Sequence, residues 1–145
     1  MKTGLFNFEG KAPDDIRSLA FIGDAVCHLY IRQLLCGNGG NVKGLTVQAA
    51  AYASATGQAK AASAVMELMQ EDEADIFRRG RNAKCGVVPR KTDPLDYRKA
   101  TGFEALVGWL YLNGRAERLS LLLDSAYMEP KGRSNCGGND IITIE

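Results

Sequence analysis

The chain has 145 residues, 46% of them hydrophobic and 24% charged, which is the balance of an ordinary globular protein with one compact domain. Its net charge of +1 at pH 7 gives no sign, taken alone, of a nucleic-acid binder. No apolar run approaches the ~20 residues that span a bilayer, and no basic segment followed by an apolar stretch marks an export signal.

The first half of the chain predicts three helices after a loose lead-in over residues 1–13. Apolar residues recur at helical spacing over about 16–36, with Asp14 or Asp15 placed to cap the first turn. The glycines that follow Cys36 end this helix, because they adopt the left-handed conformation readily. Alanine-rich segments over about 42–53 and 56–70 predict two more helices that pack closely.

The second half predicts a long loop between helices. A short helix over 72–79 ends at Gly80, and residues 80–96 form an extended loop, a kind of segment that is more often functional than a linker. An amphipathic helix over about 94–113 buries Phe103, Leu106, Val107 and Leu110, and a last helix covers about 115–125. The fold class is therefore all-α: a lead-in (1–13), one helical domain (14–126) and a flexible tail (127–145).

Positive charge is concentrated in one segment. Between positions 78 and 99 there are eight basic residues and two acidic ones, so this segment carries +6 and leaves −5 for the rest of a chain whose total is +1. A local basic block in an acidic chain favours a docking site for a polyanion over a loop with scattered charge. The eight basic residues are Arg78, Arg79, Arg81, Lys84, Arg90, Lys91, Arg98 and Lys99.

Two carboxylates, Asp24 and Glu104, lie mid-helix among small and apolar residues. A buried carboxylate is costly unless it is paired or bound to a metal ion. If the two helices pack together, the carboxylates make an oxygen-rich site that suits Mg²⁺, which can activate water and neutralise a phosphodiester. The alternative is structural: Asp24 would serve as a cap or local ion pair, and Glu104 would pair with Arg98 or Lys99. Composition alone leaves both open.

Other candidate sites are weaker. His28, one turn after Asp24, could act as a general base, although a lone histidine on a helix face is more often structural or contacts the ligand. The four cysteines, at positions 27, 36, 85 and 136, form neither a CxxC pair nor a cluster with His28. This spacing disfavours a zinc site, and reduced intracellular thiols are expected rather than a disulfide framework.

Four motifs resemble the ribonuclease III family. The segment 19–26, Leu-Ala-Phe-Ile-Gly-Asp-Ala-Val, is similar to the family's signature helix with its catalytic aspartate. The segment 103–108, Phe-Glu-Ala-Leu-Val-Gly, resembles the motif that carries the catalytic glutamate. Segments 79–84 and 97–106 are more selective and resemble the Mini-ribonuclease III branch, which lacks a separate domain for binding double-stranded RNA. Ala20 and Thr101 stand where full-length members have further acidic residues, as is typical of this branch.

The resemblance implies an enzyme. It would be a homodimeric, helical, Mg²⁺-dependent endoribonuclease, with Mn²⁺ as a substitute, that cuts double-stranded RNA and leaves 5′-phosphates. Asp24 and Glu104 would be catalytic and would hold the metal. The RNA would be bound by Arg78, Arg79, Arg81, Asn82, Lys84 and Arg98.

The resemblance also implies a cellular role. Bacterial members mature both ends of the 23S ribosomal RNA precursor in the cytoplasm, and plant or algal relatives act in the chloroplast stroma. A ribosomal protein is a candidate additional partner, and no membrane is expected. Two rival hypotheses remain: a catalytically silent RNA-binding or assembly module, and a purely structural helical dimer. Both carboxylates argue against the first rival, and the +6 segment argues against the second.

Overall fold

A computed structural model describes residues 2–3, 6–7, 11–84 and 86–128. The described part contains α1 (Ile16–Gly37), α2 (Val42–Ala53), α3 (Ala55–Val65), α4 (Glu71–Asn82), α5 (Pro94–Leu112) and α6 (Ala116–Tyr127). A 3₁₀ turn, η1 (Met66–Leu68), follows α3. The only strands described are the two-residue β1 (Lys2–Thr3) and β2 (Phe6–Asn7), which pair antiparallel. The expected all-α class is confirmed.

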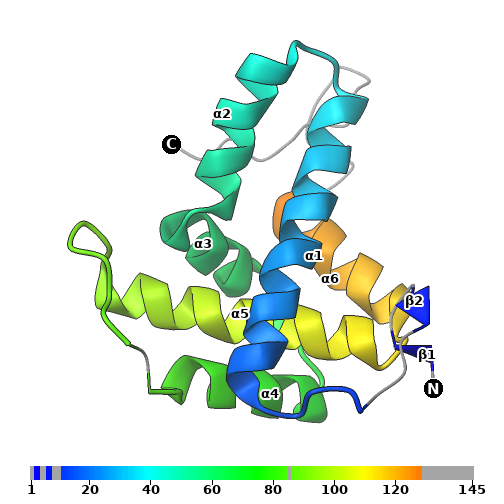
Figure 1. The fold of residues 1–145 in the computed structure, drawn as a ribbon, viewed down its shortest axis with the longest axis vertical. Coiled ribbons are helices and arrows are strands. Elements are labelled where there is room, and N and C mark those ends of the chain that lie inside the picture. Colours follow the sequence, from blue (N-terminus) through cyan, green and yellow to red (C-terminus); the bar gives the residue numbers. More distant parts are fainter. Residues whose placement is uncertain (1, 4–5, 8–10, 85, 129–145) are drawn as a thin grey trace.

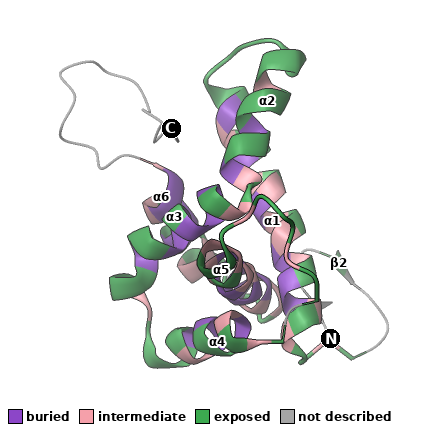
Figure 2. Cartoon of the chain, turned by 90° about the vertical axis from the view of Figure 1, so that its left-hand side faces the viewer, coloured by how far each residue is buried: buried purple, intermediate pink, exposed green. Residues whose placement is uncertain are grey.

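Helix α5 is the centre of the bundle. It packs most extensively against α1, and also against α4 and α3, whereas α2 extends away beside the far end of α1 (Figure 1). Three side chains of α5, Phe103, Leu106 and Leu110, are completely buried. Buried residues line the faces that the surrounding helices turn toward α5 (Figure 2). The face predicted from the helical period is therefore the core face.

Two glycines let α1 and α5 cross with their backbones in contact. A Cβ atom added to Gly23 would overlap the backbone carbonyl oxygen of Glu104, and one added to Gly108 would overlap that of Leu19. Only glycine permits so close an approach. Asp24 and Glu104 flank this crossing, so the same contact that closes the core also brings the two carboxylate-bearing turns together.

Helix α4 is longer than the sequence predicted. Gly80 was expected to end it, but the helix continues to Asn82 and is capped at Ala83. Gly80 is buried against α5, where an added Cβ would lie 2.8 Å from the Cα of Gly102. The glycine therefore provides close packing instead of helix termination, and the connection to α5 shortens to residues 83–93.

The helix starts follow the usual chemistry of caps. The Asp15 carboxylate accepts a hydrogen bond from the Ser18 backbone N–H at 2.9 Å, so the second of the two predicted caps is used. Asn41, Ser54 and Asp93 cap α2, α3 and α5 in the same way. The third predicted helix is divided: α3 ends at Val65 and continues as the 3₁₀ turn.

Helix α1 passes a simple test for a membrane span. It has 22 residues and a stretch with mean hydropathy 1.3, long and apolar enough to cross a bilayer, and it is the one such helix in the described part. The uninterrupted-run criterion used on the sequence did not detect it. Core helices pass the same test, and the packing of α1 against α5 fits a core helix. The predicted flexible tail lies outside the described residues, apart from Tyr127 and Met128 at its start.

Candidate active site

The structure places Asp24 and Glu104 on adjacent turns of α1 and α5. The residue before Asp24, Gly23, lies against the Glu104 backbone, and the charge of Asp24 acts on the Glu104 carboxyl. The Asp24 side chain is 49% exposed, whereas Glu104 is largely buried beside it. The pair thus has one solvent-facing member and one deeper member. This is the juxtaposition that the two motifs predicted.

Burial makes Glu104 an unusual acid. Removal from water and, second, the negative charge of Asp24 raise its pKa from 4.5 to about 8. In the metal-free protein, this carboxyl therefore carries a proton near neutral pH. A site that penalises negative charge in this way favours a cation, because positive charge relieves both causes of the shift.

The structure treats the two structural alternatives differently. Asp24 caps no helix, but its Oδ1 lies 3.3 Å from Nε2 of His28, one turn along α1, and with a protonated imidazole this contact is the local ion pair that the alternative expected. Within the described residues, Glu104 has no ion pair with Arg98 or Lys99, and Lys99 instead donates to Ser63 Oγ at 3.4 Å. His28 therefore lies beside the exposed carboxylate, and the deeper one forms no ion pair with a residue that the structure describes.

The site offers hard oxygen ligands for a metal ion, but only a few of them. Among the described residues, no group of three or more histidine, cysteine and acidic side chains is close enough to hold a metal ion. Ala20 is buried, and the Thr101 hydroxyl donates to the Tyr97 carbonyl at 2.9 Å, so neither supplies a further carboxylate. Two carboxylate oxygens suit Mg²⁺, which commonly takes one or two carboxylates and keeps several waters.

The predicted RNA-binding residues lie on two elements. Arg78, Arg79, Arg81 and Asn82 belong to the last turns of α4, not to a loop, and Lys84 follows directly; Arg98 lies on the first half of α5. All are exposed except Arg81, which is partly buried with its guanidinium 6.0 Å from the Phe77 ring.

Specific contacts fix this basic surface. Arg78 forms an ion pair with Asp75, one turn earlier. The Arg17 guanidinium, from α1, donates to the Lys84 carbonyl oxygen. The basic surface and the carboxylate pair are thereby both attached to the α1–α5 unit.

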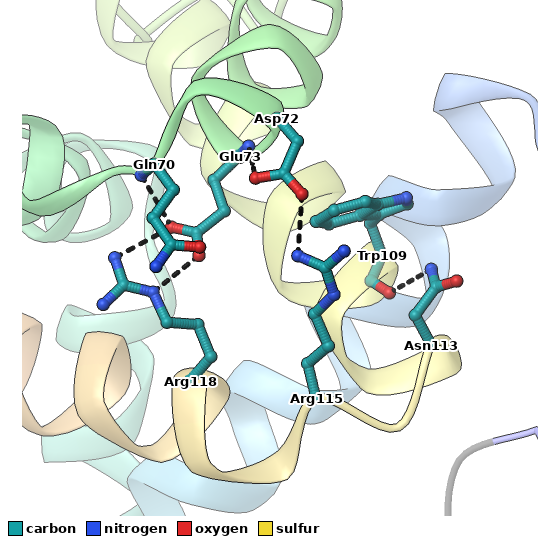
Figure 3. Close-up of polar contacts among 7 residues, drawn as sticks. All are labelled: Gln70, Asp72, Glu73, Trp109, Asn113, Arg115 and Arg118. Carbon is teal, nitrogen blue, oxygen red and sulfur yellow. Dashed lines mark hydrogen bonds and ion pairs between the residues drawn. The ribbon is translucent and has the colours of Figure 1, made fainter.

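A polar network that the sequence analysis missed connects α4 to α6 (Figure 3). Glu73 is fully buried and accepts from Nε of Arg118 at 2.6 Å and from the Gln70 backbone N–H at 3.2 Å. Beside it, Arg115 donates to Asp72 at 2.8 Å and lies 4.5 Å from the centroid of Trp109. The Gln70-x-x-Glu73 spacing of a capping box was the one available signal. The network holds in place the helix that carries the basic residues.

A second group that the sequence analysis missed is buried in the core. Cys27, Gln58 and Tyr127 are each at most 1% exposed, and the Tyr127 hydroxyl donates to Gln58 Oε1. The Gln58 Nε2 has no hydrogen-bond partner in the described part of the protein. A buried donor without a partner costs about 1–3 kcal/mol, so this amide stabilises the core less than an apolar side chain of the same size would.

The comparisons with known proteins agree on the family. Residues 17–115 match the family described as "Ribonuclease III domain". A Mini-ribonuclease 3 of Symbiobacterium thermophilum is 46% identical over 110 residues, which cover 75% of this chain and 85% of that protein. One of Brevibacillus brevis is 41% identical over 118 residues, covering 80% and 87%. A crystal structure of a Fusobacterium nucleatum protein superposes with a TM-score of 0.70 at 28% identity, covering 77% of this chain and 89% of that one.

The helical domain with its paired carboxylates is thus a ribonuclease III domain. The chain belongs to the ribonuclease III family and, within it, to the Mini-ribonuclease 3 branch. It is accordingly an endoribonuclease.

Proposed function

We propose that this endoribonuclease hydrolyses double-stranded RNA with Asp24 and Glu104 holding Mg²⁺ between them. The observation that carries the proposal is the backbone contact at Gly23, which brings the two carboxylate-bearing turns together, while Glu104 forms no ion pair among the described residues. Mg²⁺, when bound, supplies positive charge that neutralises the phosphodiester and favours ionisation of a water molecule. Mn²⁺ has a similar preference for oxygen ligands and is expected to substitute.

The two carboxylates have different tasks in this proposal. Asp24, held by His28 and half exposed, faces the substrate side, whereas Glu104 provides the inner oxygen ligand after losing its proton. Water attacks the phosphorus and the 3′ oxygen leaves, which yields a 5′-phosphate and a 3′-hydroxyl. Since Ala20 and Thr101 supply no carboxylate, RNA phosphate and water would have to provide the remaining ligands of the metal ion.

We propose that RNA is gripped by the α4 end and the start of α5. Arg78, Arg79, Arg81, Asn82, Lys84 and Arg98 are placed there, and all but Arg81 are exposed. Contacts to phosphates and 2′-hydroxyls recognise the shape of an A-form duplex more than its sequence. Because such contacts release counterions, binding should weaken steeply as salt increases.

We further propose that the enzyme is a homodimer that meets through α1. Phe21 and Leu29, two turns apart on this helix, are 82% and 60% exposed, and the small residue Ala25 lies between them. With α6 and the N-terminal segment they line a mostly apolar hollow of about 930 Å³. Large apolar side chains so exposed mark an interaction surface, and a second copy of the chain is the occupant expected here.

The resemblance to the Mini branch supports the finer biological proposals. We propose the two ends of the 23S ribosomal RNA precursor as the substrate, in the bacterial cytoplasm or, for a plant or algal protein, the chloroplast stroma. A ribosomal protein is the additional partner proposed for that substrate.

Cleavage of an end-labelled RNA duplex, with a DNA duplex of the same sequence as control, tests the proposal. We expect RNA to be cut in Mg²⁺ and not in EDTA, and DNA to stay intact in both. Metal-independent cutting would contradict the proposed role of the carboxylates. Salt-sensitive binding of the RNA duplex without any cutting would instead favour the silent-module alternative.

A further inference from the structure

The connection between α4 and α5 carries basic residues that the core does not hold in place. Lys84, Arg90 and Lys91 lie on it and are exposed, and Val87 between them is 95% exposed. An exposed segment with few packed side chains has little to fix its position. Ordering such a segment when a ligand binds costs free energy, so a contact that fixes it beforehand strengthens binding.

Arg17 of α1 provides a contact of this kind. It lies in the first turn of α1 and is exposed, and its guanidinium donates a hydrogen bond to the backbone carbonyl oxygen of Lys84. That carbonyl follows the end of α4 at Asn82 by two residues. The nearby hydrogen bond from the Ala83 N–H to the Gly80 carbonyl oxygen is long, at 3.3 Å. The end of α4 is therefore held by α1 as well as by its own backbone.

The helix that makes this contact also carries Asp24. Arg17 and Asp24 are seven residues apart, close to two full turns, so they lie on the same side of α1 and about 10 Å apart along its axis. This distance corresponds to a few base pairs of a duplex. α1 therefore fixes how far the start of the basic connection lies from the carboxylate pair.

The acceptor of the Arg17 hydrogen bond leaves the positive charge of the basic surface intact. Arg78 forms an ion pair with Asp75, which cancels charge. Arg17 forms no ion pair in the part of the chain that the structure describes, and its acceptor is a neutral carbonyl. A backbone acceptor thus holds the chain without lowering the positive potential that attracts a polyanion.

We propose that Arg17 is a positioning residue for RNA binding. It holds the backbone of Lys84, so that the basic connection meets the duplex at a fixed distance from Asp24 and Glu104. Arg17 acts through this backbone contact and not by binding a phosphate itself. The inference rests on the proposed binding of RNA by the α4 end and the start of α5. Loss of the contact should weaken binding and leave the cleavage step unchanged, because the carboxylate pair is not altered.

Arg17→Met tests the contact, because methionine is a long side chain and a good helix former but has no hydrogen-bond donor. Fluorescence anisotropy with a labelled RNA duplex in EDTA gives the Kd without cleavage. We expect the Kd to rise by about tenfold, the order expected for one hydrogen bond from a charged group. The cleavage rate in Mg²⁺ at saturating protein should stay close to that of the wild type. Arg17→Lys, which can still donate to the carbonyl, should restore most of the binding.

Two further measurements separate this role from a direct phosphate contact. Hydrogen exchange of the RNA-free protein at the amides of residues 82–84 should be faster in Arg17→Met, whereas loss of a phosphate contact would not change it. Arg17→Met combined with Lys84→Met should raise the Kd by less than the product of the two single effects, because the Lys84 side chain contributes less once its backbone is released. Unchanged exchange, or effects on the Kd that multiply, would overturn the inference.

Lys43→Met is the matched control, because it removes one exposed positive charge from α2, which extends away beside the far end of α1 (Figure 1). Its Kd should be close to that of the wild type, and an Arg17→Met Kd no higher than the Lys43→Met Kd would overturn the inference. If the wild type does not bind the duplex, the proposed function fails and the inference fails with it. If the wild type binds and Arg17→Met binds equally well, only the role of Arg17 is refuted.

Discussion

Replacing Glu104 by glutamine should make the metal-free protein more stable, and increasingly so as the pH rises. Burial and the charge of Asp24 raise the Glu104 pKa from 4.5 to about 8, so the folded protein binds this proton more tightly than the unfolded chain. Unfolding then releases a proton between these two pH values, and stability falls as the pH rises through them. Glutamine has nearly the same shape and remains neutral at every pH.

The size of the effect follows from the same shift. If the whole pKa shift contributed to stability, the charged carboxylate would lower the free energy of unfolding by at most about 5 kcal/mol above pH 8. Because part of Glu104 still contacts solvent, we expect about 2 kcal/mol, which corresponds to a rise in melting temperature of roughly 6–8 °C for a domain of this size. Below pH 4.5 the advantage of the variant should vanish.

Circular dichroism melts in EDTA at pH 5, 7 and 9 measure this difference. We expect a small difference between wild type and Glu104→Gln at pH 5 and the full difference at pH 9. Asp24→Asn should reduce it, since that change removes the second cause of the shift. Saturating Mg²⁺ should stabilise the wild type alone and close the gap. A difference independent of pH, or none at pH 9, would refute the electrostatic account of the site.

Three other changes test the packing and the proposed interface. Gly23→Ala forces a Cβ into the Glu104 carbonyl, so it should lower the free energy of unfolding in urea by about 3 kcal/mol. Gly37→Ala is the control, because a Cβ there meets open space and should change stability little. Equal effects of the two changes would contradict the close crossing of α1 and α5. Glu73→Gln leaves the Arg118 guanidinium without its buried partner and should cost about 3 kcal/mol, with the exposed Glu71→Gln near zero as its control. Phe21→Glu should shift the protein from dimer to monomer in sedimentation. Val87→Glu is the control, because Val87 lies in the loop before α5 and is 95% exposed, and this variant should remain dimeric. A Phe21→Glu protein that still sediments as a dimer would exclude the α1 interface.

The helical period predicted most of the fold because the core is built from regular amphipathic faces. Phe103, Leu106 and Leu110 recur at helical spacing on one side of α5, and all three are completely buried. Gly80 was misjudged because a glycine can end a helix or allow a close crossing. Only the partner helix, with Gly102 opposite, decides between the two.

The carboxylate pair and the buried polar groups differ in how far they could be predicted from the sequence. Asp24 and Glu104 could be recognised because each is a charged residue whose neighbours in the sequence are small or apolar. Gln58 and Glu73 were not, because their hydrogen-bond partners, Tyr127 and Arg118, lie 69 and 45 residues away. From the sequence alone, a polar residue in a helix is expected to face solvent, because a partner so far along the chain cannot be identified.

Single-turnover cleavage of an end-labelled RNA duplex by wild type and Asp24→Asn, at protein concentrations that saturate both, tests the central claim most directly. If Asp24 and Glu104 together hold the metal that serves cleavage, the variant should bind the duplex as well as the wild type does. Its cleavage rate in Mg²⁺ should fall by about 10³-fold or more. Mg²⁺-dependent cleavage by Asp24→Asn at close to the wild-type rate would contradict the claim.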